Sequence, residues 1–177
     1  MRLVFCSFDI ILVMFTSIQI ILRGTMVKKL RIRVLALALF HQGDHILVGE
    51  NIHPDSGKVF YRPIGGGVEF GERAADALTR EIMEETGAEV RDLRYLCTLE
   101  NRFEYMGKPG HEICLIFDGA FVDEANQSLD ATLRGVDDGE VLFDAMWKPI
   151  SFFQETDRQL YPDGLLDYLL HEKVNFD

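Results

Sequence analysis

Residues 66–88 read GGVEFGERAADALTREIMEETGA, and this stretch of sequence decides the fold class. Apolar residues recur in it at helical spacing, with Leu78 and Ile82 on the face that should pack against a sheet. The pattern predicts an amphipathic helix over residues 72–86. Gly87 follows at the position where glycine ends helices, because it adopts the left-handed conformation without steric cost.

Three glutamates crowd one side of the predicted helix. Glu81 and Glu85 are four residues apart, so they are neighbours that repel each other at the border of the apolar stripe. Partial burial there raises the cost of keeping both charged. A divalent cation removes this conflict, since Mg²⁺ prefers carboxylate oxygens, and Glu84 can reach the same ion from the flank. Arg80 is placed to pair with Glu84. The alternative is an ordinary salt-bridged, solvated helix.

Three consecutive glycines, Gly65, Gly66 and Gly67, precede this helix. We expect a loop over residues 64–67, whose free backbone could offer carbonyls to a metal or amides to a phosphate. Two other glycine motifs are excluded. No Gly-Lys-Ser/Thr follows, as a P-loop requires, and Phe70 stands where a dinucleotide-binding motif needs its third glycine.

The spacing of these residues resembles the signature box of the Nudix hydrolases. Gly66 is followed by five residues, Glu72, seven residues and then the run from Arg80 to Gly87. The resemblance implies an α/β fold, an α/β/α sandwich around a mixed β-sheet. It also implies hydrolysis of a phosphoanhydride bond in a nucleoside diphosphate linked to another group, with Mg²⁺ or Mn²⁺ required. Ala88 departs from the family, which usually has a larger aliphatic residue there, and this should affect packing rather than chemistry.

The resemblance also implies roles for individual residues. Arg80 matches the arginine that orients the glutamates, and Glu72 matches a supporting acid. Glu81 is the first choice for the base that takes a proton from the attacking water. Some families of this superfamily take the base from a loop outside the box. The metal ligands that the resemblance implies are Glu81, Glu84, Glu85 and the Gly66 carbonyl, the catalytic set is Arg80, Glu81 and Glu84, and the alternative bases are Glu112, Asp123 and Glu124.

Residues outside the box offer weaker candidates for substrate binding. Arg62, just before the glycines, either contacts a substrate phosphate or is a surface charge. Phe103, Tyr105 and Trp147 either stack on a base or belong to the core. The substrate stays open among oxidised nucleoside triphosphates, ADP-ribose, dinucleoside polyphosphates and nucleotide sugars. The candidate substrate-binding residues are Arg62, Gly65, Gly67 and Glu112.

The rest of the chain predicts mixed α and β structure. Alternating or continuous apolar runs predict strands, and glycine or proline clusters predict the turns between them. A polar, acidic segment at 123–140 is expected to be irregular. The predicted strands are 30–40, 46–49, 58–62, 93–103, 112–121 and 141–147, with hairpin turns at 41–45 and 106–110 and a closing helix at 162–170.

Composition excludes several classes of protein. The chain has 177 residues, with 18 Lys and Arg against 29 Asp and Glu, so its net charge of −11 disfavours nonspecific nucleic-acid binding. A hydrophobic content of 47% excludes a disordered chain. Three scattered cysteines, Cys6, Cys97 and Cys114, do not form a disulfide framework, which favours a cytoplasmic protein. A homodimer is our expectation for the oligomeric state.

The first 25 residues differ from the domain predicted over 26–177. Asp9 interrupts their apolar stretch, and the uncharged run 10–22 is too short for the roughly 30 Å hydrocarbon layer, so we do not expect membrane insertion. Because Met26 resembles an ordinary start, we expect 1–25 to be a hydrophobic extension outside the native protein. A membrane anchor, or a strand or helix added to the domain, are the alternatives. For the whole chain, the alternatives to an enzyme are a catalytically inactive nucleotide sensor and a membrane-tethered interaction protein.

Overall fold

The computed structural model describes residues 30–137, 140–155 and 157–171. All elements described below belong to the unit formed by residues 32–177. The three interpretations of residues 1–25 fall outside the described residues. Among the described residues, no helix has the length and apolar character needed to cross a bilayer.

The first sheet has four strands and holds the glycine run at one edge. Strand β1 pairs in parallel with β7 and antiparallel with β5, and β6 pairs antiparallel with β7, so the sheet is mixed. The order across the sheet is β5 (Ile64–Gly67), β1 (Arg33–Ala38), β7 (Lys108–Phe121) and β6 (Val90–Tyr105).

The second sheet has six strands. Strand β2 (His41–Gln42) pairs with β3 and lies off the main path. The other pairings are antiparallel except that of β10 with β4. The order is β10 (Gln159–Leu160), β4 (Val59–Arg62), β3 (His45–Ile52), β9 (Glu140–Pro149) and β8 (Thr132–Asp137).

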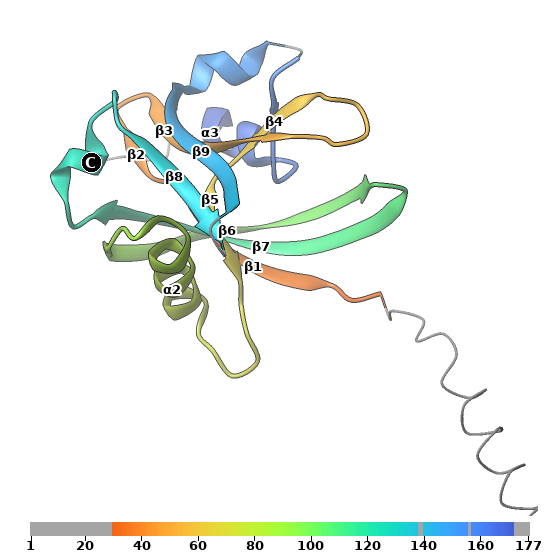
Figure 1. Cartoon of the computed structure of the whole chain (residues 1–177), viewed down its shortest axis with the longest axis horizontal. Coiled ribbons are helices and arrows are strands. Elements are labelled where there is room, and N and C mark those ends of the chain that lie inside the picture. The colour runs from red at the N-terminus through yellow and green to blue at the C-terminus, as the bar shows by residue number, and fades with distance from the viewer. Residues whose placement is uncertain (1–29, 138–139, 156, 172–177) are drawn as a thin grey trace, which may run out of the picture. The chain divides into compact units, whose positions relative to one another are not determined.

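The two helices belong to buried clusters on opposite faces of β1, and Figure 1 shows them on opposite sides of the sheet that contains β1. Ala36 packs in one buried cluster with Leu78 of α2 (Ala74–Thr86), whereas Leu35 packs in another with Leu165 of α3 (Leu165–His171). Successive strand residues point to opposite faces, so α2 and α3 lie on opposite sides of this sheet. Two short 3-10 helices, η1 (Glu124–Gln127) and η2 (Ile150–Gln154), complete the fold. The expected α/β/α sandwich around a mixed sheet is confirmed.

Helix α2 forms where the apolar spacing predicts it, with a later start. Leu78 and Ile82 are fully buried. Gly87 ends the helix in the left-handed conformation, with φ of 70°, and its N–H donates to the Met83 carbonyl. The predicted start at residue 72 is wrong by two residues. Glu72 lies in the preceding turn, where its carboxylate accepts a hydrogen bond from the backbone N–H of Glu69.

The glycine run is a strand, and the predicted loop over 64–67 is wrong. The backbone of β5 pairs with residues 35–38 of β1. Gly65 has a φ of 130°, and a side chain there would overlap the Ala36 carbonyl and the Leu78 side chain. The absence of a side chain at Gly65 therefore lets β5 pack closely between β1 and α2. The sequence composition alone did not indicate this role.

Other boundaries also differ from the predictions, and the turn predicted at 41–45 contains β2 at its start. The segment predicted to be irregular, 123–140, contains η1 and β8. Strand β8 lies at the edge of the second sheet, where polar side chains can stay exposed, and its exposed Arg134 pairs with Asp144 of β9 at 2.9 Å. The closing helix begins at Leu165 rather than at Pro162. The turn predicted at 106–110 is shorter, so β6 and β7 form a long hairpin that extends to the right in Figure 1.

Candidate functional site

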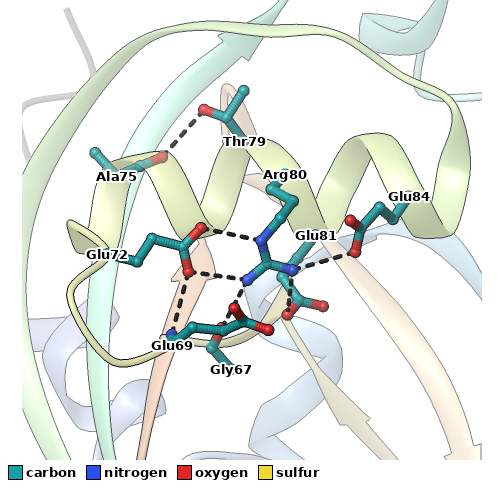
Figure 2. A network of polar contacts seen from close by, with 8 residues as sticks. All are labelled: Gly67, Glu69, Glu72, Ala75, Thr79, Arg80, Glu81 and Glu84. Carbon is teal, nitrogen blue, oxygen red and sulfur yellow. Dashed lines mark hydrogen bonds and ion pairs between the residues drawn. The ribbon is translucent and has the colours of Figure 1, made fainter.

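Arg80 lies at the centre of a fork of polar contacts on α2 (Figure 2). Its Nε and Nη2 donate to the two carboxylate oxygens of Glu72, at 2.9 and 3.0 Å. Its Nη1 donates to Glu81 Oε1 at 3.0 Å and to Glu84 Oε2 at 3.1 Å. Nη2 also donates to the Gly67 carbonyl at 3.1 Å. One guanidinium thus ties three acids of the predicted box to the glycine strand, and the predicted pairing of Arg80 with Glu84 is present.

These hydrogen bonds fix the charge of the network. The bonds to Glu72 first, and then to Glu81 and Glu84, raise the pKa of Arg80 above its ordinary value. Hydrogen bonds from Arg80, and then from the Glu69 backbone, lower the pKa of Glu72. The Arg80 side chain is 29% exposed and that of Glu81 20%. The network is therefore partly screened from water, where charge-assisted hydrogen bonds hold side-chain geometry well.

Gly66 determines where the Glu81 side chain can lie. A side chain at position 66 would overlap the Glu81 carboxylate, whereas one at position 67 would meet nothing within 4 Å. Glu81 therefore occupies the space that the missing Cβ of Gly66 leaves on β5. This contact between strand and helix brings together two residues of the predicted metal set.

The chemistry of the acids fits a hard divalent cation. Arg80 takes one oxygen of Glu81 and one of Glu84, which leaves the second oxygen of each carboxylate for another ligand. Glu85 is half-buried one turn further along the helix. Within the described part of the chain, no three His, Cys, Asp or Glu side chains already form a metal-binding group. Carboxylate oxygens are the donor type that Mg²⁺ prefers. In this structure the Glu81 and Glu84 carboxylates are arranged around Arg80.

A pocket of about 280 Å³ lies between the two sheets and brings several predicted residues together. Arg62 and Glu112 line it, together with Phe103 and Tyr105. Arg62 Nη2 donates to the Gly65 carbonyl at 3.4 Å, which connects the pocket to the glycine strand.

The remaining candidates lie elsewhere in the fold. Trp147 belongs to the buried core, and its indole N–H donates to the Asn126 carbonyl. Asp123 is engaged in capping η1, where it accepts from the Ala125 N–H. Ala88 is buried in the core beneath α2, as its expected packing role requires. Cys114 is also buried, and burial raises its pKa to about 12, which excludes a reactive thiolate.

Several pocket residues were not found from the sequence. Arg33, whose side chain is 62% exposed, and the buried Asn101 line it, as do the aromatic residues His53, Phe60 and Tyr161. Asn101 lies in β6 at an inward-facing register, where a polar side chain needs a partner. The aromatic residues come from separate strands and loops, so no spacing rule joins them.

The fold and the Arg80 network define an α/β/α protein with a glutamate-bearing helix packed on a glycine strand. A model of the NUDIX domain family matches residues 29–163, well over half of the chain. The chain belongs to the Nudix family. The expected assignment to the Nudix hydrolases is therefore confirmed.

The individual relatives are similar to this chain in fold, and they match it over a short segment or at low sequence identity. A curated relative, the NAD-capped RNA hydrolase NudC of Photorhabdus laumondii, is 40% identical over 55 residues, 31% of this chain and 21% of the relative. The chain thus matches about a fifth of that protein's length. A solved Nudix hydrolase from Nitrosomonas europaea is similar with a TM-score of 0.50 and 23% identity, over 70% of this chain and 76% of that one. The E. coli ORF135 protein has a TM-score of 0.50 and 20% identity, over 84% and 96%.

Proposed function

We propose that this protein hydrolyses a phosphoanhydride bond in a nucleoside diphosphate linked to another group, with Mg²⁺ or Mn²⁺ as the required cation. The observation that carries the proposal is the Arg80 fork, which holds Glu72, Glu81 and Glu84 beside the glycine strand. An arginine among acids could also serve only to stabilise a surface helix. The fit of Glu81 into the space above Gly66 favours a positioned side chain over a solvated one.

The acids would divide the work among themselves. Glu81, Glu84 and Glu85, with the Gly66 carbonyl, would hold the cation. When bound, the cation polarises the phosphoryl oxygens and lowers the pKa of a coordinated water. Arg80 keeps Glu81 and Glu84 in fixed rotamers through one oxygen of each. We assign Glu81 as the acceptor of the proton from the attacking water.

The pocket would receive the nucleoside part of the substrate. Arg62 lines it and contacts the Gly65 carbonyl, so its guanidinium lies between the pocket and β5. This position suits an arginine that binds a phosphate as the chain of phosphates leaves the pocket. Positioning and neutralisation of charge are most of what phosphoryl transfer requires of a protein.

The test is turnover of a substrate panel by the purified chain with Mg²⁺ or Mn²⁺, with products identified by mass. The panel contains nucleoside triphosphates, ADP-ribose, dinucleoside polyphosphates and nucleotide sugars. We expect Glu81→Gln and Glu85→Gln to lower turnover by about 10²–10⁴-fold. The matched control is Glu89→Gln, which makes the same chemical change at an exposed position beyond Gly87. Binding of nucleotides without any product would instead support an inactive sensor, and unchanged turnover in both helix variants would overturn the proposed site.

A further inference from the structure

A row of polar side chains from three strands lines the pocket. Arg33 of β1, Glu112 of β7 and Asn101 of β6 are paired in register across three neighbouring strands. Arg33 Nη2 lies 3.4 Å from Glu112 Oε1, and Asn101 Nδ2 donates to Glu112 Oε2 at 3.3 Å. The next inward row, Leu35, Cys114 and Leu99, is apolar. Glu112 is therefore the central acceptor at the border of an apolar surface.

The Glu112 carboxylate can accept more hydrogen bonds than it does, whereas the Asn101 amide already uses both its oxygen and its nitrogen. The Glu112 residue is only 5% exposed, and both of its contacts are longer than a typical charge-assisted hydrogen bond. A carboxylate accepts about four hydrogen bonds. Asn101, by contrast, donates to Glu112 and accepts from the Asp163 backbone N–H at 3.3 Å, so its amide is already fixed at both ends. A ligand donor in the pocket would meet Glu112.

Flat aromatic surfaces flank this carboxylate. Phe103 is paired with Gly110, and a side chain at position 110 would overlap the Phe103 ring, so the ring lies over the bare glycine. Across the pocket, His53 and Phe60 have ring centroids 4.4 Å apart, and Phe60 and Tyr161 5.7 Å apart. All four rings line the pocket. Such walls suit a planar ring between them more than a sugar.

We propose that Glu112 selects guanine as the base of the substrate, an inference that rests on the proposed function of the same site. Guanine carries two adjacent N–H donors, at N1 and N2, which match the two oxygens of one carboxylate. Adenine and cytosine place a ring-nitrogen acceptor beside their amino group, and uracil places its single N–H donor between two carbonyls. Each of these bases would direct an acceptor at Glu112, which can only accept when ionised.

Glu112 and the acids of α2 lie on opposite faces of β1, so a nucleotide that joins them would pass around the edge strand β5. Along β1, Glu112 is paired with Arg33 and Gly66 with Ala36, three residues apart, or about 10 Å. Strands β7 and β5 flank β1, which adds about 5 Å to each side. Arg62 lies in the same pocket and contacts Gly65. A nucleotide with its base at Glu112 would therefore reach Glu81 past Arg62 and the edge strand β5.

The experiment measures binding without turnover. GMP, dGMP, IMP, AMP, CMP and UMP are titrated calorimetrically into the full chain in the absence of metal. IMP is the decisive comparison because it lacks only the N2 amino group. We expect GMP and dGMP to bind about 10–150-fold more tightly than IMP, because IMP loses one of the two hydrogen bonds to the charged carboxylate. Glu112→Gln should abolish this preference, weakening GMP binding more than IMP binding, because IMP makes only the N1–H contact.

The control is Glu100→Gln, the same change at an exposed residue of β6 outside the pocket lining. It should retain the preference for GMP. Equal binding of GMP and IMP by the unmodified chain would overturn the proposal, whether or not the variant folds. Loss of dGMP binding would also overturn it, because the carboxylate would then be contacting the ribose hydroxyls. Hydrolysis without guanine preference refutes this inference alone, whereas GMP preference without hydrolysis of any substrate refutes the proposed function alone.

Discussion

Substitution of Gly66 by alanine tests whether the glycine strand positions Glu81. A Cβ at position 66 would overlap the Glu81 carboxylate, so that side chain must leave its rotamer and its contact with Arg80. Gly67→Ala is the matched control, since nothing lies within 4 Å of its added Cβ and the Gly67 carbonyl can still accept from Arg80. Both variants lose the same glycine freedom, so their difference isolates the overlap with Glu81.

The expected size of the effect follows from these contacts. An off-rotamer side chain and a weakened charge-assisted hydrogen bond together cost about 1–2 kcal/mol of unfolding free energy. For a domain of this size that lowers Tm by about 2–8 °C. Displacement of a reacting group by about 1 Å costs about 10²-fold in rate. Gly66→Ala should therefore lose about 10²-fold in kcat, and Gly67→Ala less than about threefold.

The assay combines steady-state hydrolysis of the best substrate from the panel, thermal unfolding, and Mn²⁺ titration followed by electron paramagnetic resonance. Gly66→Ala should bind Mn²⁺ more weakly than Gly67→Ala while both remain folded at the assay temperature. Equal kcat in the two variants would refute the reasoning, because the position of Glu81 would then not depend on the missing Cβ.

Two further predictions concern titratable groups. Hydrogen bonds from Arg80 and the Glu69 backbone lower the pKa of Glu72. The Glu72 carboxylate therefore stabilises the fold at pH values above the ordinary pKa of glutamate, and this contribution is lost as the pH falls through the lowered pKa. The Tm difference between the unmodified chain and Glu72→Gln should therefore shrink from about pH 6 to about pH 3, and a constant difference would contradict this. Burial raises the pKa of Cys114 to about 12, so mass spectrometry should find iodoacetamide on Cys114 at about pH 8 only after unfolding; labelling of the folded protein would show that the thiol is accessible.

The sequence predicted helix α2 and its acids well because their physical causes are local. Burial of Leu78 and Ile82 follows from spacing on one helix, and the contact of Arg80 with Glu84 follows from a separation of four residues. The left-handed conformation of Gly87 follows from the preference for glycine at the residue that ends a helix.

What the sequence could not predict depends on pairing between distant segments. The glycines at 65–67 look like a loop until β1 is placed beside them, and only then does Gly65 prove to need its positive φ for close packing. Asn101 reads as an ordinary polar residue until β7 sets Glu112 opposite it. Both features require sheet register, which periodicity within one segment does not contain.

The Arg80 fork has a consequence for the protein when metal is scarce. Because the guanidinium cannot give up its proton under ordinary conditions, the acids around it always have an internal cation. If the proposed site is correct, chelation should leave the helix anchored and the enzyme dormant rather than denatured. Activity would then return as soon as the ion is restored, without a refolding delay.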